Sequence, residues 1–188
     1  MTTSRDELLA ANAAFARSFT PRRLPRTPAR RLAVLTCMDA RMDPAAFLGL
    51  REGDAHVIRN AGGRASGDAV RSLLISHKLL GTDQWLVIHH TDCGQETYSG
   101  ETMRRLCAPR SREAEAIDWL TIADREQAVV DDVRRLRLHP LVPPEVAIHG
   151  FLYDLATGRL AEVETASRTG PAEAGAEEPV SASPTSPA

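Results

Sequence analysis

The chain has 188 residues, of which 43% are hydrophobic and 26% are charged, and its formal net charge is -2 at pH 7. This length and composition fit one globular domain with a hydrophobic core of its own. The nearly neutral charge argues against nucleic acid as a partner, and the sequence lacks the run of about 20 apolar residues that crosses a membrane. The N-terminus also lacks the apolar core of a signal peptide, so we expect a cytoplasmic protein.

Residues 1–30 predict a helix followed by an extended arm. Ser4 and Glu7 have the spacing of a capping box, and the apolar residues that follow recur at helical spacing until Pro21 ends the helix. Prolines and arginines fill the rest of the segment, which therefore holds no regular structure. An arm of this kind could carry the helix across a neighbouring subunit.

Residues 31–165 alternate between strand patterns and helix patterns. Short apolar runs predict strands at 31–36, 55–58, 84–88 and 146–152, and periodic segments predict helices at 44–48, 66–80, 99–107 and 124–139. A turn at Thr157-Gly158 lets residues 160–163 pair back as a hairpin partner. We expect a single α/β domain with a mostly parallel central sheet, an antiparallel edge strand and helices on both faces.

Residues 166–188 form a third segment of different composition. It consists almost entirely of Ala, Glu, Pro, Ser, Thr and Gly, and Val180 is its only large apolar residue. Such a composition buries too little apolar surface to offset the entropy of ordering, so we expect a disordered tail.

Two predicted strands end in residues that bind soft metals. Cys37 follows the strand at 31–36, and His90 and Cys93 follow the strand at 84–88. Neighbouring parallel strands end on the same side of a sheet, so these three side chains can converge. Two thiolates and one imidazole suit zinc, and three protein ligands leave the fourth tetrahedral position open, as in a catalytic site.

Asp39 and Arg41 follow the first of these cysteines. A carboxylate beside zinc either coordinates the metal or hydrogen-bonds the water bound to it, and a guanidinium favours the second role by holding the carboxylate. Zinc lowers the pKa of bound water to about 7, so Asp39 would orient a hydroxide at neutral pH. His89 competes with His90 as a ligand, but adjacent strand residues face opposite sides and only one can reach the metal.

The remaining candidates have structural interpretations. We expect hydrogen-bonded core, helix-surface or interface roles for His56, His77, His139 and His149, and a small buried apolar role for Cys107. Asp92 is expected to accept a backbone hydrogen bond, and Arg59 is either a pocket residue or an ion-pair partner.

Three motifs occur in register, namely Cys37-Met38-Asp39-Ala40-Arg41, His56-Val57-Ile58-Arg59-Asn60-Ala61-Gly62-Gly63 and His89-His90-Thr91-Asp92-Cys93-Gly94. Together they resemble the β-class carbonic anhydrases, most of all their compact bacterial and archaeal branch. The closing segment from Gly150 to Leu160 is similar to the last hairpin of that family.

The resemblance implies a zinc enzyme that interconverts carbon dioxide and water with bicarbonate and a proton. By position, Cys37, His90 and Cys93 would bind one zinc ion per chain, Asp39 and Arg41 would form the catalytic dyad, and Asn60, Gly62 and Gly63 would line the pocket. It also implies a homodimer or higher oligomer in which the N-terminal helix packs on the partner.

Two alternatives remain open from the sequence. Some relatives with the same ligands hydrolyse carbon disulfide or similar molecules, so the ligands specify the metal better than the substrate. A zinc–thiolate protein that senses redox state or binds a partner needs no turnover. The Asp39–Arg41 pair argues against this second alternative, because a sensing zinc has no use for a carboxylate held off the metal.

Overall fold

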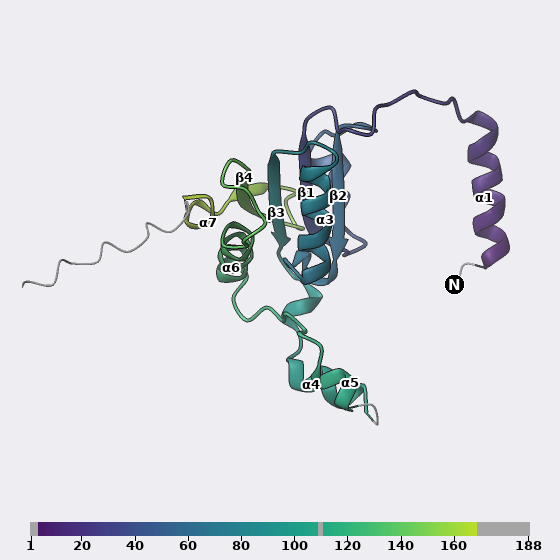
Figure 1. Cartoon of the computed structure of the whole chain (residues 1–188). Coiled ribbons are helices and arrows are strands. Elements are labelled where there is room, and N and C mark those ends of the chain that lie inside the picture. The colour runs from purple at the N-terminus through teal and green to yellow at the C-terminus, as the bar shows by residue number, and fades with distance from the viewer. Residues whose placement is uncertain (1–3, 109–110, 169–188) are drawn as a thin grey trace, which may run out of the picture.

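A five-stranded sheet forms the centre of the molecule in the computed structural model, which describes residues 4–108 and 111–168 (Figure 1). The spatial order is β2-β1-β3-β4-β5. The strands are β1 (Leu32–Cys37), β2 (Ala55–Asn60), β3 (Gln84–His90), β4 (Ala147–Tyr153) and β5 (Leu160–Glu162). The first four are parallel and β5 is an antiparallel edge strand, which confirms the predicted fold class.

The helices are α1 (Arg5–Ser18), α2 (Pro44–Phe47), α3 (Gly67–Lys78), α4 (Gly100–Leu106), α5 (Ser111–Glu115), α6 (Arg125–Arg137) and α7 (Glu164–Arg168), with 3₁₀ turns η1 (Ala61–Gly63) and η2 (Gly94–Glu96). Helices α2, α3, α4 and α6 lie between strands, as the periodic segments predicted, and α1 precedes β1, whereas α5 and α7 were not predicted. The side chains of Ser66 and Asp124 cap α3 and α6 by accepting backbone N–H groups in the first turn.

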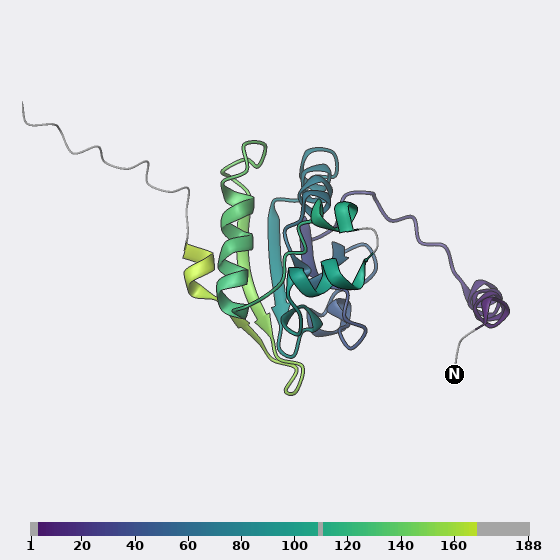
Figure 2. The same cartoon turned by 90° about the horizontal axis from the view of Figure 1, so that it is seen from below.

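The two faces of the sheet are covered unequally. On one face α3 packs on β1 and β2, while α6 packs on β3 and β4, and these elements enclose the main core (Figure 2). Strand side chains alternate, so Ala33 and Leu35 face these helices and Leu32 and Val34 face the other way. That second face is covered by α2 and the loop after it, with Phe47 stacked on Tyr153 at a ring-centroid distance of 4.2 Å.

The end of the described chain differs from the sequence expectation. Residues 166–168 were predicted to begin a disordered tail, but they belong to α7, and Ala166 is fully buried. Ala166 fits there because Gly150 on β4 has no side chain, since a Cβ atom on Gly150 would lie 2.8 Å from the Ala166 Cβ. Composition alone does not reveal such close packing of small residues. The rest of the predicted tail, residues 169–188, lies outside the described residues.

Helix α1 stands apart from the sheet at the end of an extended arm (Figure 1). It has the predicted capping box, in which the Ser4 hydroxyl accepts from the Glu7 N–H and the Glu7 carboxylate accepts from the Ser4 N–H. Within the described chain α1 has no buried residue, and Leu8 and Phe15 are each 62% exposed. In residues 4–108 and 111–168, no helix combines the length and apolarity that crossing a membrane requires.

Candidate metal centre

Three soft ligands meet at the carboxyl ends of β1 and β3. Cys37 is the last residue of β1, His90 is the last residue of β3, and Cys93 lies in the loop that follows. Because β1 and β3 are adjacent and parallel, their ends bring these residues together, with the ligand atoms of all three within 4.8 Å of one another. All three are buried, and the two sulfur atoms are 3.9 Å apart.

The imidazole of His90 is oriented for metal binding. Its Nδ1 lies 2.9 Å from the Thr91 carbonyl, which can only accept, so Nδ1 carries the proton and donates it. Nε2 is then left with a free lone pair, and this buried atom has no hydrogen-bond partner among the described residues. Buried polar atoms are rarely left unpaired, and a histidine that binds a metal through one nitrogen usually donates from the other. This geometry fits a metal ligand.

The two thiols also require a cation to ionise together. The two sulfur atoms share a hydrogen bond in which either thiol can be the donor, and this contact lowers the pKa of Cys37 to about 4 and raises the pKa of Cys93. The pair therefore holds one negative charge rather than two, since two thiolates at this distance repel each other. A divalent soft cation removes that repulsion, which is why this donor set fits zinc.

Asp39 and Arg41 form a bidentate pair beside the three ligands. Arg41 Nε donates to Asp39 Oδ1 at 2.9 Å and Nη2 donates to Oδ2 at 2.7 Å. These hydrogen bonds hold the pKa of the Asp39 carboxyl well below its usual range, so it stays ionised at neutral pH. Asp39 Oδ2 also lies 3.9 Å from His90 Nε2, which places the carboxylate at the edge of the ligand cluster.

Two further side chains support this pair, one from β2 and one from the loop after β3. Arg59 donates to the carbonyls of Cys37 and Asp39 at 2.9 and 2.6 Å. It therefore binds the backbone at the end of β1 rather than lining the pocket. Asp92 was expected to accept a backbone hydrogen bond, but its carboxylate accepts from Arg41 Nη1 at 2.6 Å.

The glycine-rich loop places its three candidate residues differently. Gly62 lines the cavity beside the ligands, as the resemblance implied. Asn60 instead bonds the backbone of Arg64 through both ends of its amide and so braces the loop. Gly63 lies against the ends of β1 and β3, where a Cβ atom would be 2.9 Å from the Cys37 nitrogen, so its role is close backbone packing.

A cavity of about 360 Å³ opens beside the ligand cluster. Its lining includes Cys37, Asp39, Gly62 and Cys93, together with Met38, Ala61, Gly94, Gln95, Thr97 and Tyr98. The sequence did not single out Gln95 or Tyr98, which lie just after the third motif in an irregular segment without a periodic signal. Burial raises the pKa of Tyr98, so its hydroxyl keeps its proton and remains a donor.

His89 faces away from the metal ligands, as strand alternation predicted. Its Nε2 is 3.0 Å from Asp132 on α6, and the same carboxylate oxygen accepts from Arg64 Nε at 2.7 Å. Arg64 also donates to the Leu120 carbonyl. This buried group joins the glycine-rich loop to α6, and its members are too far apart in sequence for the motifs to have revealed it.

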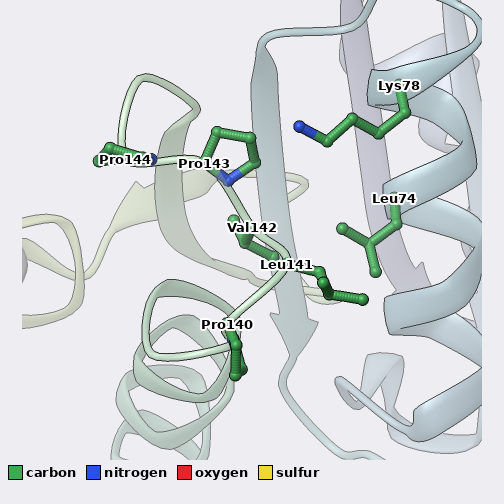
Figure 3. A pocket seen from close by; sticks show the side chains of 7 residues that line it. All are labelled: Leu74, Lys78, Pro140, Leu141, Val142, Pro143 and Pro144. Carbon is green, nitrogen blue, oxygen red and sulfur yellow. The ribbon is translucent and has the colours of Figure 1, made fainter.

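A second cavity, of about 520 Å³, lies at the opposite end of the sheet (Figure 3). It is bounded by Leu74 and Lys78 of α3 and by the proline-rich loop 140–144 that leads to β4. Its walls are mostly aliphatic and prolyl, and it contains none of the metal-binding side chains. The ligand cluster lies at the other end, where β1 and β3 finish.

Comparisons with known proteins point to one family. Residues 32–160 match the family model for carbonic anhydrase. Beta-carbonic anhydrase 1 of Mycobacterium tuberculosis is 38% identical over 161 residues, which are 86% of this chain and 98% of the relative. The crystal structure of a carbonic anhydrase from Streptococcus mutans matches with a TM-score of 0.79 and 42% identity, covering 87% of this chain and 99% of that one. A carbon disulfide hydrolase from an Acidianus species is 34% identical over 155 residues, which are 70% of this chain and 76% of the relative.

Proposed function

The chain belongs to the β-class carbonic anhydrase family, whose members are zinc enzymes, and on this premise we propose that it catalyses the reversible hydration of carbon dioxide to bicarbonate and a proton. The observation that carries the proposal is the Asp39–Arg41 pair beside a buried Cys-His-Cys cluster. A purely structural zinc site is closed by four protein ligands, whereas this cluster supplies three and borders a cavity.

Cys37, His90 and Cys93 would hold the zinc ion. When bound, zinc would act as a Lewis acid that lowers the pKa of water and so provides hydroxide as a nucleophile at neutral pH. Asp39 is ionised and can only accept hydrogen bonds. It would accept a hydrogen bond from the attacking oxygen and so direct a lone pair of that oxygen toward the carbon of carbon dioxide. Arg41 holds the carboxylate in that orientation through two bonds.

Replacing Asp39 by Asn tests this role. The amide is nearly the same size, but it loses the charge that pairs with Arg41 and can no longer accept at both atoms. We expect Asp39→Asn to keep about one zinc per chain and to lose carbon dioxide hydration by about 100-fold or more, because the attacking oxygen is no longer oriented. Stopped-flow hydration with a pH indicator, together with elemental analysis of the protein, measures both quantities.

Asp68→Asn is a matched control, because Asp68 forms an exposed ion pair with Arg71 away from the ligands. It should behave as wild type. Full hydration activity in zinc-loaded Asp39→Asn would remove Asp39 from the mechanism, and inactivity of the zinc-loaded wild-type protein would overturn the proposed function.

A second candidate, hydrolysis of a carbon disulfide-like substrate by the same residues, is favoured by the Acidianus relative. Parallel assays of hydrogen sulfide release from carbon disulfide and of carbon dioxide hydration separate the two. The third candidate, a zinc–thiolate sensor without turnover, leaves the bidentate contact between Arg41 and Asp39 without a purpose.

We further propose that the protein assembles as a homodimer or higher oligomer in the cytoplasm. Leu8, Leu9 and Phe15 of α1 are exposed although Phe15 contacts Phe19, and such apolar surfaces usually mark protein contacts. All three cysteines are free thiols, which fits a reducing compartment.

A further inference from the structure

Arg41 is held by two acidic residues from two different loops. On one side it binds the Asp39 carboxylate, its neighbour on the loop after β1. On the other side Nη1 donates to Asp92 Oδ2 at 2.6 Å and Nη2 donates to the Asp92 carbonyl at 2.8 Å. Asp92 lies between His90 and Cys93, so Arg41 links the loop after β1 to the loop after β3, next to all three residues of the ligand cluster.

The backbone of Asp92 is shaped for this contact. Its φ is +55°, in the left-handed region that few residues other than glycine adopt. This conformation allows the carbonyl and the carboxylate of one residue to reach the same guanidinium. Unusual backbone conformations of this kind gather at functional sites, where the surrounding structure maintains them.

Stability does not account for the contact. The Arg41 side chain is 51% exposed and the Asp92 side chain is 79% exposed. Ion pairs at such positions add little to folding because water and salt screen them. What the two bonds to Asp92 do determine is the orientation of the guanidinium, because a long arginine side chain held at one edge alone can rotate.

That orientation decides what Asp39 binds. Its Oδ2 is 2.7 Å from Arg41 Nη2 and 3.9 Å from His90 Nε2, so the carboxylate lies between the guanidinium and the metal ligands. Carboxylates coordinate zinc readily. We propose that Asp92 is a positioning residue, which anchors Arg41 across the two loops and thereby keeps Asp39 off the metal and the fourth coordination position open.

The proposal rests on the proposed function only in assuming that a metal binds. Its test therefore measures ligand binding to the metal-loaded protein and not catalytic activity. Asp92→Gly removes the carboxylate without backbone strain, since glycine adopts positive φ freely. Asp92→Asn keeps the size and also tolerates positive φ, so it serves if the glycine variant does not fold. Asp68→Asn again provides an exposed Asp–Arg control.

The readout is thiocyanate binding to cobalt(II)-substituted protein, followed by visible absorption. Thiocyanate needs the open position, so coordination by Asp39 weakens it. We expect Asp92→Gly to raise the thiocyanate Kd about three- to fivefold, the range of an exposed ion pair, with a smaller rise for Asp92→Asn. In an Asp39→Asn background there is no carboxylate to move, so Asp92→Gly should change the Kd by less than about twofold.

Unchanged thiocyanate affinity in both Asp92 variants overturns the proposal. An equal loss of affinity with and without Asp39 also overturns it, because the effect then does not pass through Asp39. Failure of the proposed function has a different signature, namely absent carbon dioxide hydration in wild-type protein whose thiocyanate affinity still responds to Asp92.

Discussion

Adjacent histidines at the end of β3 have unrelated roles because a strand sends neighbouring side chains to opposite faces. His90 turns toward the two cysteines, and its backbone-bonded Nδ1 leaves Nε2 free. His89 turns toward α6 and pairs with Asp132. Alternation indicated that only one of the two histidines can join the ligands, and the spacing to Cys93 together with the family resemblance favoured His90. The partner of His89 could not be predicted, because it lies 43 residues away on another element.

Cysteine substitutions test the ligand set directly. Cys93→Ser replaces a soft thiolate by a hydroxyl that stays protonated at neutral pH, so we expect zinc affinity to fall by more than about 100-fold, beyond what loss of a supporting residue causes. Cys107→Ser is the matched control, because Cys107 follows α4 and is not part of the ligand cluster. Competition with a chromophoric chelator measures the affinities. Equal zinc binding by both variants would contradict the assignment of Cys93.

The elements around the site could be predicted in part. Cys37, Asp39 and Arg41 lie at the end of one strand, and His90 and Cys93 lie at the end of its neighbour. Local patterns and the parallel-strand rule therefore predicted that these five residues lie close together. The supporting contacts of Arg59 and Asp92 were not predictable. They join residues that are 20 and 51 positions apart in the chain, and their geometry depends on sheet register and on the positive φ of Asp92, neither of which leaves a periodic signal.

Gly63 packs directly against the backbone of β1 and β3. Its φ is +69°, and a Cβ atom would meet the Cys37 nitrogen and the Thr36 carbonyl carbon, both at 2.9 Å. Backbone atoms cannot yield as a flexible side chain can, so Gly63→Ala should displace the end of β1. We expect a loss of about 2–4 kcal/mol in the free energy of unfolding, measured by urea denaturation, together with weaker zinc binding.

Gly67, the first residue of α3, is the control for the same substitution. A Cβ there meets no atom within 4 Å, and alanine favours helices, so Gly67→Ala should be neutral or stabilise by up to about 1 kcal/mol. If Gly63→Ala is as stable as Gly67→Ala, the close packing of η1 on the sheet does not exclude a side chain at position 63.

At the scale of the whole molecule, the sheet and its core contrast with helix α1, which lies apart from them. The core around α3 and α6 is complete within one chain, whereas α1 extends from the sheet with its apolar residues in solvent (Figure 1). The sequence predicted both the helix and the extended arm. It could not predict where α1 packs, because the capping box and helical spacing are local features, whereas docking depends on a surface outside the helix.

The apolar side of α1 provides the test of assembly. Leu8 and Phe15 lie on one side of the helix and Ala10 and Ala13 on the opposite side, so a Leu8→Glu and Phe15→Glu double variant and an Ala10→Glu and Ala13→Glu double variant carry the same added charge. Burying a Leu or Phe side chain contributes about 1.5–3 kcal/mol, so the first variant should weaken association at least about 100-fold and shift the mass toward 20.4 kDa. The second variant should keep the wild-type mass in light scattering after size exclusion. A monomeric wild-type protein, or two variants that both keep the wild-type mass, would show that α1 does not hold the assembly together.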